Sequence, residues 1–451
     1  MKRLIAFIMI FGFVAAIIPA ADFSWTAWGR GVFSPVSFSG EDSSVSAATH
    51  SSADQPRITF ALAGTADSEL VGFNADFYWD GGIPAVGESA NVWAQPFDFL
   101  RLKIGKFNEN DYRGIIGNTE FAGWILPNSG KDEDAVFTRF QATGGAFLAI
   151  TPLFWLNSDW NGLSIEASIG SSYGGGQSGR NVLGMDALDV YKAIQIGLGY
   201  TIPTIGFFRA QFIGNNRAEL LYLYGSRTPT DRKLMEGLTK NRDADVVELA
   251  FSFTMIEDLT VELGAKLPFK FETDAAIELY PALYPIIPTI TANLRDSALQ
   301  LPCSFALGAV YALNDFNILA RVDLSMGGQT EQINVVTFDY GMTLNFWLNP
   351  SYRIYGACTV GLDIGMEMHT KDTKTTLLNG KEPIENSEYF DFGFGPWVEK
   401  DLGGGSIKLG LMVMFPGTDR YSYDRTRTPS FIQTFSTDPV ISIPISITYS
   451  L

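Results

Sequence analysis

Short runs in which apolar and polar residues alternate recur along this chain. The run 70–79 is the clearest: Val71, Phe73, Ala75, Phe77 and Trp79 fall on one face, and Gly72, Asn74, Asp76 and Tyr78 fall on the other. Successive side chains of a β-strand point to opposite faces, so each such run is a strip with one apolar and one polar side. The pattern therefore predicts an all-β protein.

The same alternation covers most of the chain. Clear segments lie at 100–105, 163–169, 247–253, 261–264, 320–325, 338–345, 362–367, 390–395 and 409–413. Weaker candidates lie at 23–33, 57–65, 194–201, 206–212, 218–224 and 305–312. A final run, 440–451, alternates Ile441, Ile443, Ile445, Ile447 and Tyr449 with polar residues and Pro444.

The polar faces of these strips carry charges, and the chain begins with a secretory-type segment and ends in a predicted strand, which together favour lipid around the apolar faces over a soluble sandwich. A sandwich would bury the apolar faces between two sheets, whereas a transmembrane barrel turns them toward lipid and keeps a wet lumen. We favour a single-chain antiparallel transmembrane β-barrel. At about 25 to 30 residues per strand, the chain predicts roughly 14–18 strands, preferably an even number.

The connections are predicted to be short on the periplasmic side and long on the extracellular side. Turn-forming Asn, Asp and Pro predict tight turns at 256–258, 313–315 and 348–350. The long polar segments are 39–54, 108–134, 171–186, 226–245, 269–301, 370–386 and 417–438. One of them contains the Pro-rich apolar stretch 279–288, which either packs on the barrel rim or forms a hydrophobic plug or entry patch.

The N-terminus has the features of a secretory signal. Lys2 and Arg3 precede an apolar stretch that ends in Pro19, Ala20 and Ala21. We expect a signal peptide at 1–21 and one barrel domain at 22–451. Cys303 and Cys358 fall on the apolar faces of two predicted strands that others separate, so we expect two small buried hydrophobes and no disulfide.

Tryptophans lie beside predicted turns or loops. Trp25, Trp79, Trp155, Trp347 and Trp397 all have this position. It matches the aromatic girdles of membrane barrels at the lipid–water interface. Aromatic residues in a soluble β core are the alternative interpretation.

Composition excludes several classes of function. The formal net charge of −17 argues against nucleic-acid binding, which needs clustered Lys and Arg. The chain has two histidines, His50 and His369, and neither has a second histidine at metal-ligand spacing. Asp372 lies near His369, but no matched nucleophile accompanies them. We expect no enzymatic activity, no metal and no cofactor.

The polar faces of the predicted strands supply the candidate pore-lining residues. Nine acids and five bases share this position: Asp76, Glu166, Glu248, Glu262, Asp323, Asp339, Asp363, Glu367 and Asp391, with Arg101, Lys103, Lys266, Arg321 and Lys408. An acidic lumen concentrates cations, which predicts a mild cation preference. Ion pairs that merely fill the barrel, such as Arg321 with a neighbouring carboxylate, are the alternative. A separate basic loop with Arg420, Arg425 and Arg427 is either a solvated loop or a site for an anionic ligand.

Two segments resemble known outer-membrane proteins. The run 440–451 resembles the C-terminal strand by which the barrel-assembly machinery recognises its substrates, with Leu451 in place of the usual Phe. The run 93–107, followed by 108–114, is similar to the strand and long loop of bacterial porins, and the whole chain resembles spirochaetal porin-like proteins. The resemblance implies that the loop 108–134 folds into the lumen and narrows it.

The leading functional hypothesis is a channel in the bacterial outer membrane for passive diffusion of small hydrophilic solutes. A long-chain fatty-acid-type transporter is an alternative, suggested by the apolar stretch 279–288. A surface structural protein or adhesin that acts through its loops is another. The expected partners are outer-membrane lipid, the assembly machinery and the permeating solutes, with no nucleic acid. The sequence leaves open which solute passes and whether the chain forms homo-oligomers.

Overall fold

The structure is a computed structural model of the 451-residue chain. It describes residues 21–39, 42–46, 57–66, 68–79, 85–109, 120–126, 140–150, 162–170, 194–213, 246–268, 303–326, 329–332, 336–339, 341–371, 373–376, 380–383, 388–417, 421–423, 432–434 and 438–450.

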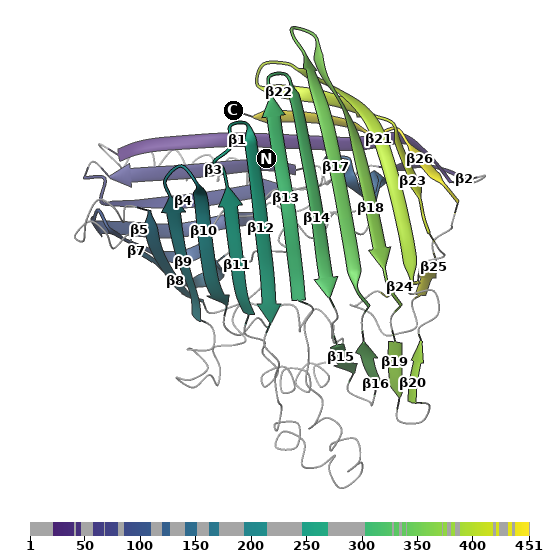
Figure 1. Ribbon diagram of the computed structural model, residues 1–451. Coiled ribbons are helices and arrows are strands. Elements are labelled where there is room, and N and C mark those ends of the chain that lie inside the picture. The colour runs from purple at the N-terminus through teal and green to yellow at the C-terminus, as the bar shows by residue number, and fades with distance from the viewer. Residues whose placement is uncertain are drawn as a thin grey trace, which may run out of the picture.

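The described strands form the wall of one barrel (Figure 1). In chain order they are β1 (Ala21–Ser39), β3 (Arg57–Ala66), β4 (Val71–Trp79), β5 (Ala85–Phe97), β6 (Leu100–Glu109), β7 (Phe140–Ile150), β8 (Leu163–Gly170), β9 (Ile194–Ile202), β10 (Gly206–Ile213), β11 (Val246–Phe253), β12 (Leu259–Pro268), β13 (Cys303–Leu313), β14 (Phe316–Met326), β17 (Thr343–Ile354), β18 (Cys358–His369), β21 (Tyr389–Asp401), β22 (Gly405–Gly410) with β23 (Met412–Phe415), and β26 (Val440–Ser442) with β27 (Ile445–Ser450).

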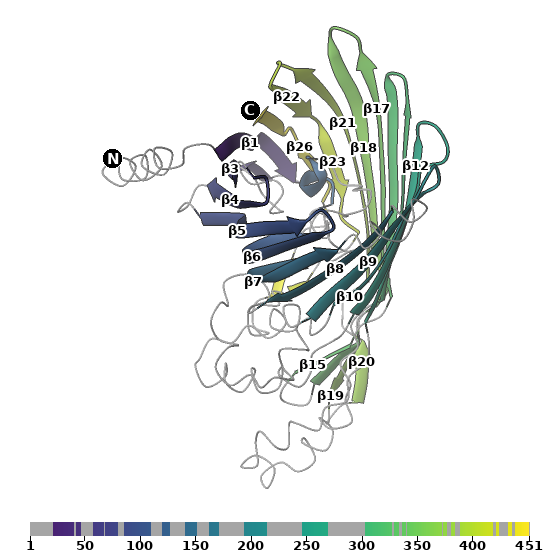
Figure 2. The ribbon, with the colours of Figure 1, turned by 90° about the vertical axis from the view of Figure 1, so that its left-hand side faces the viewer.

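Each strand pairs antiparallel with the next one along the chain, and the first strand closes the ring against the last. β1 pairs with β3 on one side and with β26 and β27 on the other. β22 and β23 together occupy one strand position in the wall, as do β26 and β27. The wall therefore has 18 strand positions, which we call staves. The prediction of an even number between 14 and 18 is confirmed. Figure 2 shows the ring from a second side.

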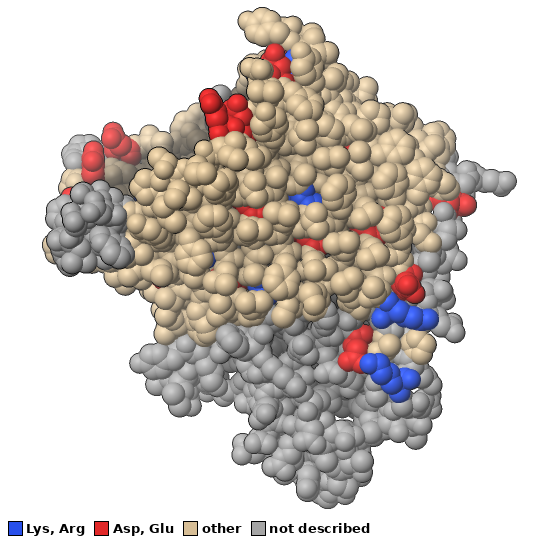
Figure 3. Space-filling model, in the orientation of Figure 1, with Lys and Arg blue, Asp and Glu red and all other residues tan. Residues whose placement is uncertain are grey.

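The wall is inside out compared with a soluble protein. In β11, Glu248 and Ser252 are buried, whereas Leu249 on the opposite face is exposed. In β6, Lys103 is buried while Ile104 is exposed. Figure 3 shows the outer face of this wall as a mostly uncharged surface, with charged side chains gathered mainly at its ends. Such a surface is stable only where lipid covers it, so the chain is a transmembrane barrel of the outer-membrane type.

The short connections lie together at one end of the barrel, where two predicted turns are confirmed. Asp258 ends the connection between β11 and β12, and Asn314 begins the one between β13 and β14. Both residues adopt left-handed backbone angles, with φ of 62° and 51°, which Asn and Asp tolerate better than most residues. Gly403 and Gly404, also at positive φ, turn the chain between β21 and β22.

The opposite end carries the long connections and three small β elements. β2 (Asp42–Ser46) folds back on the end of β1. A four-stranded sheet contains β15 (Gln329–Gln332), β16 (Val336–Asp339), β19 (Thr373–Thr376) and β20 (Gly380–Pro383). β24 (Tyr421–Tyr423) pairs with β25 (Ile432–Thr434). In Figure 1 the four-stranded sheet lies beyond the rim of the barrel.

Two sequence predictions that involve β16 and β17 are wrong. The predicted turn at 348–350 lies inside β17, and the chain reverses at residues 355–357 instead. Pro350 is accommodated there because it pairs with Ile318 of β14, while the ladder to β18 is interrupted between Leu348 and Ser351. The predicted strand 338–345 is divided between β16 and β17, so Asp339 lies outside the barrel wall.

The C-terminal run forms the last stave with a break at Pro444, which lacks an amide hydrogen for the ladder. Ile441, Ile447 and Tyr449 are exposed on the outer face, as the alternation predicts. Cys303 and Cys358 are free thiols, and β14 and β17 separate their strands. Among the described residues, no helix is long and apolar enough to cross a membrane.

Several predicted segments lie outside the described residues. They are the core of the signal peptide at 1–20, the strand candidate 218–224, the Pro-rich stretch 279–288, Trp155 and His50, together with Arg420, Arg425 and Arg427.

Candidate functional site: the inner face of the barrel

Thirteen of the fourteen predicted pore-lining residues lie in barrel strands on the polar, inward face; Asp339 is the exception. They come from many staves and differ in how much of each side chain reaches solvent. Asp76, Arg101, Glu166, Glu262, Lys266 and Asp323 are partly buried, and Lys103, Glu248, Arg321, Asp363, Glu367, Asp391 and Lys408 are buried. Burial inside the barrel requires partners, and the partners of most of these residues define three groups.

The first group forms charge pairs along β8 to β14. Arg209 of β10 donates to Glu166 of β8 across 2.5 Å. Arg321 and Asp323, two residues apart on one face of β14, are joined at 2.7 Å. The alternative in which Arg321 pairs with a neighbouring carboxylate therefore describes this part of the wall.

Sequence reasoning missed two members of this group. Arg209 and Gln211 are both inward and almost completely buried, and Gln211 donates to Glu248 of β11. The signal was available, because Arg209 and Gln211 alternate with Phe208, Ala210 and Phe212 in a predicted strand.

The second group consists of cations stacked on aromatic rings. The Arg101 guanidinium lies 4.4 Å from the centre of the Trp93 ring, and the Lys103 ammonium lies 5.6 Å from the Phe147 ring. Within the part of the chain that the structure describes, Arg101 Nε is buried with no hydrogen-bond partner. The faces of the two aromatic rings attract these side-chain cations. The strip of β6 therefore places two positive charges on the inner wall.

The third group consists of buried acids that accept hydrogen bonds from the wall. Asp363 is completely buried and accepts hydrogen bonds from Trp397 Nε1 at 2.8 Å and from Asn349 Nδ2 at 3.2 Å. Tyr389 donates to Glu367 at 2.5 Å, and the Gly417 amide donates to Asp391 at 2.9 Å. These three carboxylates hold strands together at positions where sequence parity alone predicts contact with pore water.

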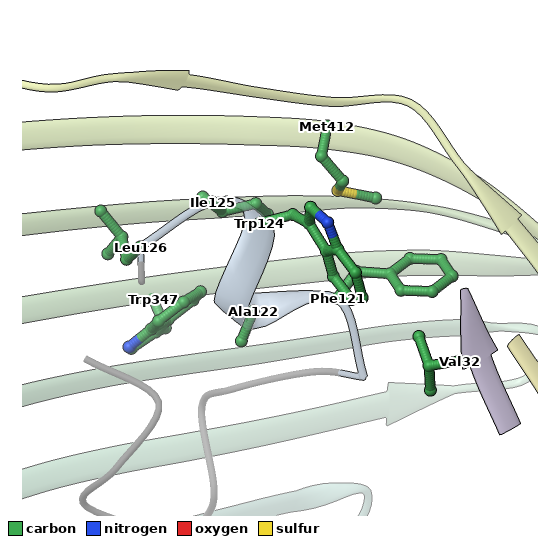
Figure 4. Packing of buried hydrophobic residues seen from close by; sticks show 8 residues of the cluster. All are labelled: Val32, Phe121, Ala122, Trp124, Ile125, Leu126, Trp347 and Met412. Atoms are coloured by element: carbon green, nitrogen blue, oxygen red, sulfur yellow. The ribbon is translucent and has the colours of Figure 1, made fainter. Parts of the chain in front are cut away.

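A short segment packs against the inner wall beside these acids. It contains the 3-10 helix η1 (Ala122–Trp124). Figure 4 shows its apolar side chains meeting Trp347 of β17, Met412 of β23 and Val32 of β1. In Figure 2 the helix lies inside the ring of strands. The described part of the loop 108–134 therefore folds into the lumen, as the resemblance to porins implies.

Burial of large side chains holds this segment in place. Phe121, Trp124, Ile125 and Leu126 are each buried, and the rings of Phe121 and Trp124 meet edge to face. Each such side chain contributes roughly 1.5–3 kcal/mol relative to exposure in water. The packed side chains occupy space inside the barrel, so this segment narrows the lumen.

Polar contacts join the same segment to the neighbouring staves. Ser446 of β27 donates to Glu120. The Lys408 ammonium of β22 lies between two rings, 4.0 Å from the centre of Trp397 and 5.2 Å from that of Phe121. Lys408 is thereby a contact between wall and segment, although it was predicted as a pore-lining charge.

Two of the tryptophans predicted to lie in the outer aromatic girdle point into the barrel instead. Trp25 and Trp79 are exposed on the outer face, as predicted, but Trp347 belongs to the buried cluster inside the barrel and Trp397 packs against that cluster. The prediction used their positions near strand ends and ignored parity. Trp347 shares its face with the inward Asn345 and Asn349, so parity could have placed it.

A second apolar cluster on the inner face joins the neighbouring strands β6 and β7 to β11, which does not pair with either of them. It contains Phe107 of β6, Phe147 of β7 and Val246 of β11. β8, β9 and β10 separate β7 from β11 in the wall. The cluster therefore brings two parts of the inner wall together, which no local pattern predicts.

Two further predicted candidates, Asp339 and His369, lie in the four-stranded sheet and at the end of β18. Asp339 pairs with Lys381 at 2.9 Å in the four-stranded sheet. His369 accepts or donates a hydrogen bond with Thr343 at 2.7 Å and stacks on Tyr389. Among the described residues, no three His, Cys, Asp or Glu side chains are grouped as metal ligands would be.

Comparison with known proteins gives similarity only at the level of structure. No family model and no curated protein sequence matches the chain. Pseudomonas aeruginosa OpdL is similar over 95% of this chain and 99% of its own, with 8% identity and a TM-score of 0.47. An anion-selective porin from Comamonas acidovorans covers 95% of this chain and 100% of its own, with 11% identity and a TM-score of 0.45.

OmpT, an outer membrane protein of Vibrio cholerae, is similar over 96% of this chain and 100% of its own length, in its trimer form. Its identity is 11% and its TM-score is 0.42. Overlap of this extent says nothing about which solute a barrel passes.

Proposed function

We propose that this protein is a passive diffusion channel of the bacterial outer membrane for small hydrophilic solutes. The observation that carries the proposal is the closed ring of 18 staves whose charged and polar residues point inward. Barrels of about this strand number are wide enough to leave an aqueous path between their inward side chains. The proposal assigns the protein no enzymatic activity and no cofactor.

Channel activity is tested by reconstituting the purified, folded barrel into planar lipid bilayers. We expect discrete conductance steps in KCl, and swelling of liposomes that contain the protein when small sugars are added outside. Protein unfolded before reconstitution is the control. A correctly folded barrel that conducts no ions and passes no sugar would overturn the proposal.

Mild cation preference is the finer part of the proposal. The acids that support it are Asp76 and Glu262, which are inward and only partly buried. Asp363, Glu367 and Asp391 give it less support than the sequence suggested, because they are buried and hydrogen-bonded within the wall. The positive charges of Arg101 and Lys103 reduce this preference for cations.

The reversal potential in a KCl gradient measures this preference. We expect the double variant Asp76→Asn with Glu262→Gln to lower the cation-to-anion permeability ratio, because rings of acidic side chains favour cations. Asp339→Asn is the matched control, since Asp339 lies in the sheet beyond the barrel. An unchanged ratio in the double variant would remove cation preference from the proposal and leave the channel.

The alternatives remain predictions. The fatty-acid-type transporter depends on the stretch 279–288, which lies outside the described residues. The adhesin hypothesis depends on the long connections, most of which are also outside them. Recognition by the assembly machinery, a ligand at Arg420, Arg425 and Arg427, and association into homo-oligomers likewise remain to be tested.

A further inference from the structure

Two glycines stand side by side on the inner wall, beneath the segment that narrows the lumen. Gly365 of β18 is directly opposite Gly393 of β21 in the strand register, and Trp347 of β17 continues the same row. Both glycines are buried and share the inward face with acids of their strands. Their missing side chains leave bare backbone at this point of the wall.

The segment 120–126 occupies that space. A Cβ atom added at Gly393 would meet Ile125 Cγ2 and would lie 2.5 Å from the carbonyl oxygen of Ile125. A Cβ atom at Gly365 would lie 2.8 Å from Leu126 Cδ1. The two positions differ in kind, because the first would collide with backbone, whereas the second would meet the end of the flexible Leu126 side chain most closely, with Cζ3 of the Trp347 ring 3.0 Å away.

A third glycine extends the contact to the next stave. A Cβ atom at Gly410 of β22 would meet Met412 Cε first and would lie 2.8 Å from Phe121 Cδ2. Three large side chains of one segment, Phe121, Ile125 and Leu126, thus fit over glycines from three neighbouring strands of the wall. Close packing of this kind requires that the wall carry no side chain there.

We propose that Gly365 and Gly393 are positioning residues of the channel, which form a seat for the segment 120–126. By holding that segment against the wall of β17 to β23, the glycine seat sets the size of solute that can pass. This inference rests on the proposed diffusion channel for its consequence, but the seat itself can be tested without any transport.

The first experiment measures whether the segment stays seated. Ala122 is buried in the segment, and Ala122→Cys changes its size little. In a background with Cys303→Ala and Cys358→Ala, we measure the rate at which a water-soluble maleimide labels this thiol. We expect Gly393→Ala to raise the labelling rate roughly tenfold or more, because the seated segment must shift its backbone and opens more often.

The geometry predicts a graded series. Gly365→Ala should raise the labelling rate much less than Gly393→Ala, because the Leu126 side chain can rotate away. Gly365→Val should raise it more, and adding Leu126→Ala should return it toward the starting rate, since the two sites share one contact. Gly31→Ala is the control, because a Cβ atom there meets nothing within 4 Å.

The second experiment measures the consequence for transport. We expect Gly393→Ala to increase single-channel conductance and to admit sugars that the unaltered barrel excludes in liposome swelling. Faster labelling with unchanged conductance and unchanged size limit would overturn the role in setting pore size. Labelling as slow in Gly393→Ala as in Gly31→Ala would overturn the seat.

The experiments distinguish failure of the channel proposal from failure of the glycine seat, and they allow for a variant that does not fold. If the unaltered barrel does not conduct, the proposed function fails while the labelling series still decides whether the seat exists. If Gly393→Ala does not insert as a folded barrel, Gly365→Val replaces it, because a side chain at Gly365 meets Leu126 of the segment. Slow labelling in folded Gly365→Val would then count against the seat.

Discussion

Glu248 and Leu249 are consecutive residues of β11, yet Glu248 is completely buried and Leu249 is 36% exposed. The charged side chain points into the barrel, where Gln211 donates a hydrogen bond to it, and the apolar one points outward. This relationship is the reverse of that in a soluble protein. It holds only if lipid covers the outer face and polar partners fill the inner one.

The outer assignment predicts the cost of a charge at Leu249. Leu249→Arg should lower the free energy of unfolding by roughly 2–4 kcal/mol if the site lies near the bilayer midplane. The measurement is urea unfolding of the barrel in lipid vesicles, with Leu249→Met as the size-matched control. Equal stability of the Arg and Met variants would argue against contact with lipid at this position.

Alternation predicts opposite chemical access for neighbouring residues of β4. In a background with Cys303→Ala and Cys358→Ala, a water-soluble maleimide should label Asn74→Cys, whose side chain faces the lumen. It should spare Phe73→Cys, whose side chain faces lipid, because thiols in hydrocarbon are not reached by the charged reagent. Labelling in the opposite phase would mean that the barrel is inverted relative to the structure.

The pair of Arg209 and Glu166 predicts a large loss of stability from a single change. Arg209→Met leaves the Glu166 carboxylate inside the wall without its charged partner, which should cost about 3–5 kcal/mol. Thermal unfolding in detergent measures the loss. Adding Glu166→Gln should restore part of the stability, and a double variant as unstable as Arg209→Met would show that the charge pair is not the cause.

Asp363 is predicted to act in folding and not in selectivity. Asp363→Ala removes the acceptor for Trp397 Nε1 and for Asn349 Nδ2, and each buried donor left unpaired costs roughly 1–3 kcal/mol. We expect a lower unfolding temperature and an unchanged reversal potential in a salt gradient. A shifted reversal potential with unchanged stability would return Asp363 to the pore lining.

Much of the barrel wall follows from the alternation of residue types. The facing of β4, β11 and β14 can be predicted because a strand has a fixed period of two, so one buried or charged residue assigns all the others. Turns at Asp258 and Asn314 were predictable because Asn and Asp tolerate left-handed backbone. The turn predicted at Pro350 is wrong, because a proline ends a strand only where a neighbouring strand needs the amide hydrogen that proline lacks. The sequence does not show which neighbouring strand that is.

The partners of the inward side chains were decided only by folding of the whole chain. Sequence parity places Asp363, Lys408 and Trp397 on the inner face. It cannot say that Trp397 donates to Asp363 or that Lys408 lies against Phe121, a residue far away in sequence. Which charges remain at pore water depends on what covers the inner wall. Closure of the ring brings the segment 120–126 onto Gly365 and Gly393, and that contact exists only in three dimensions.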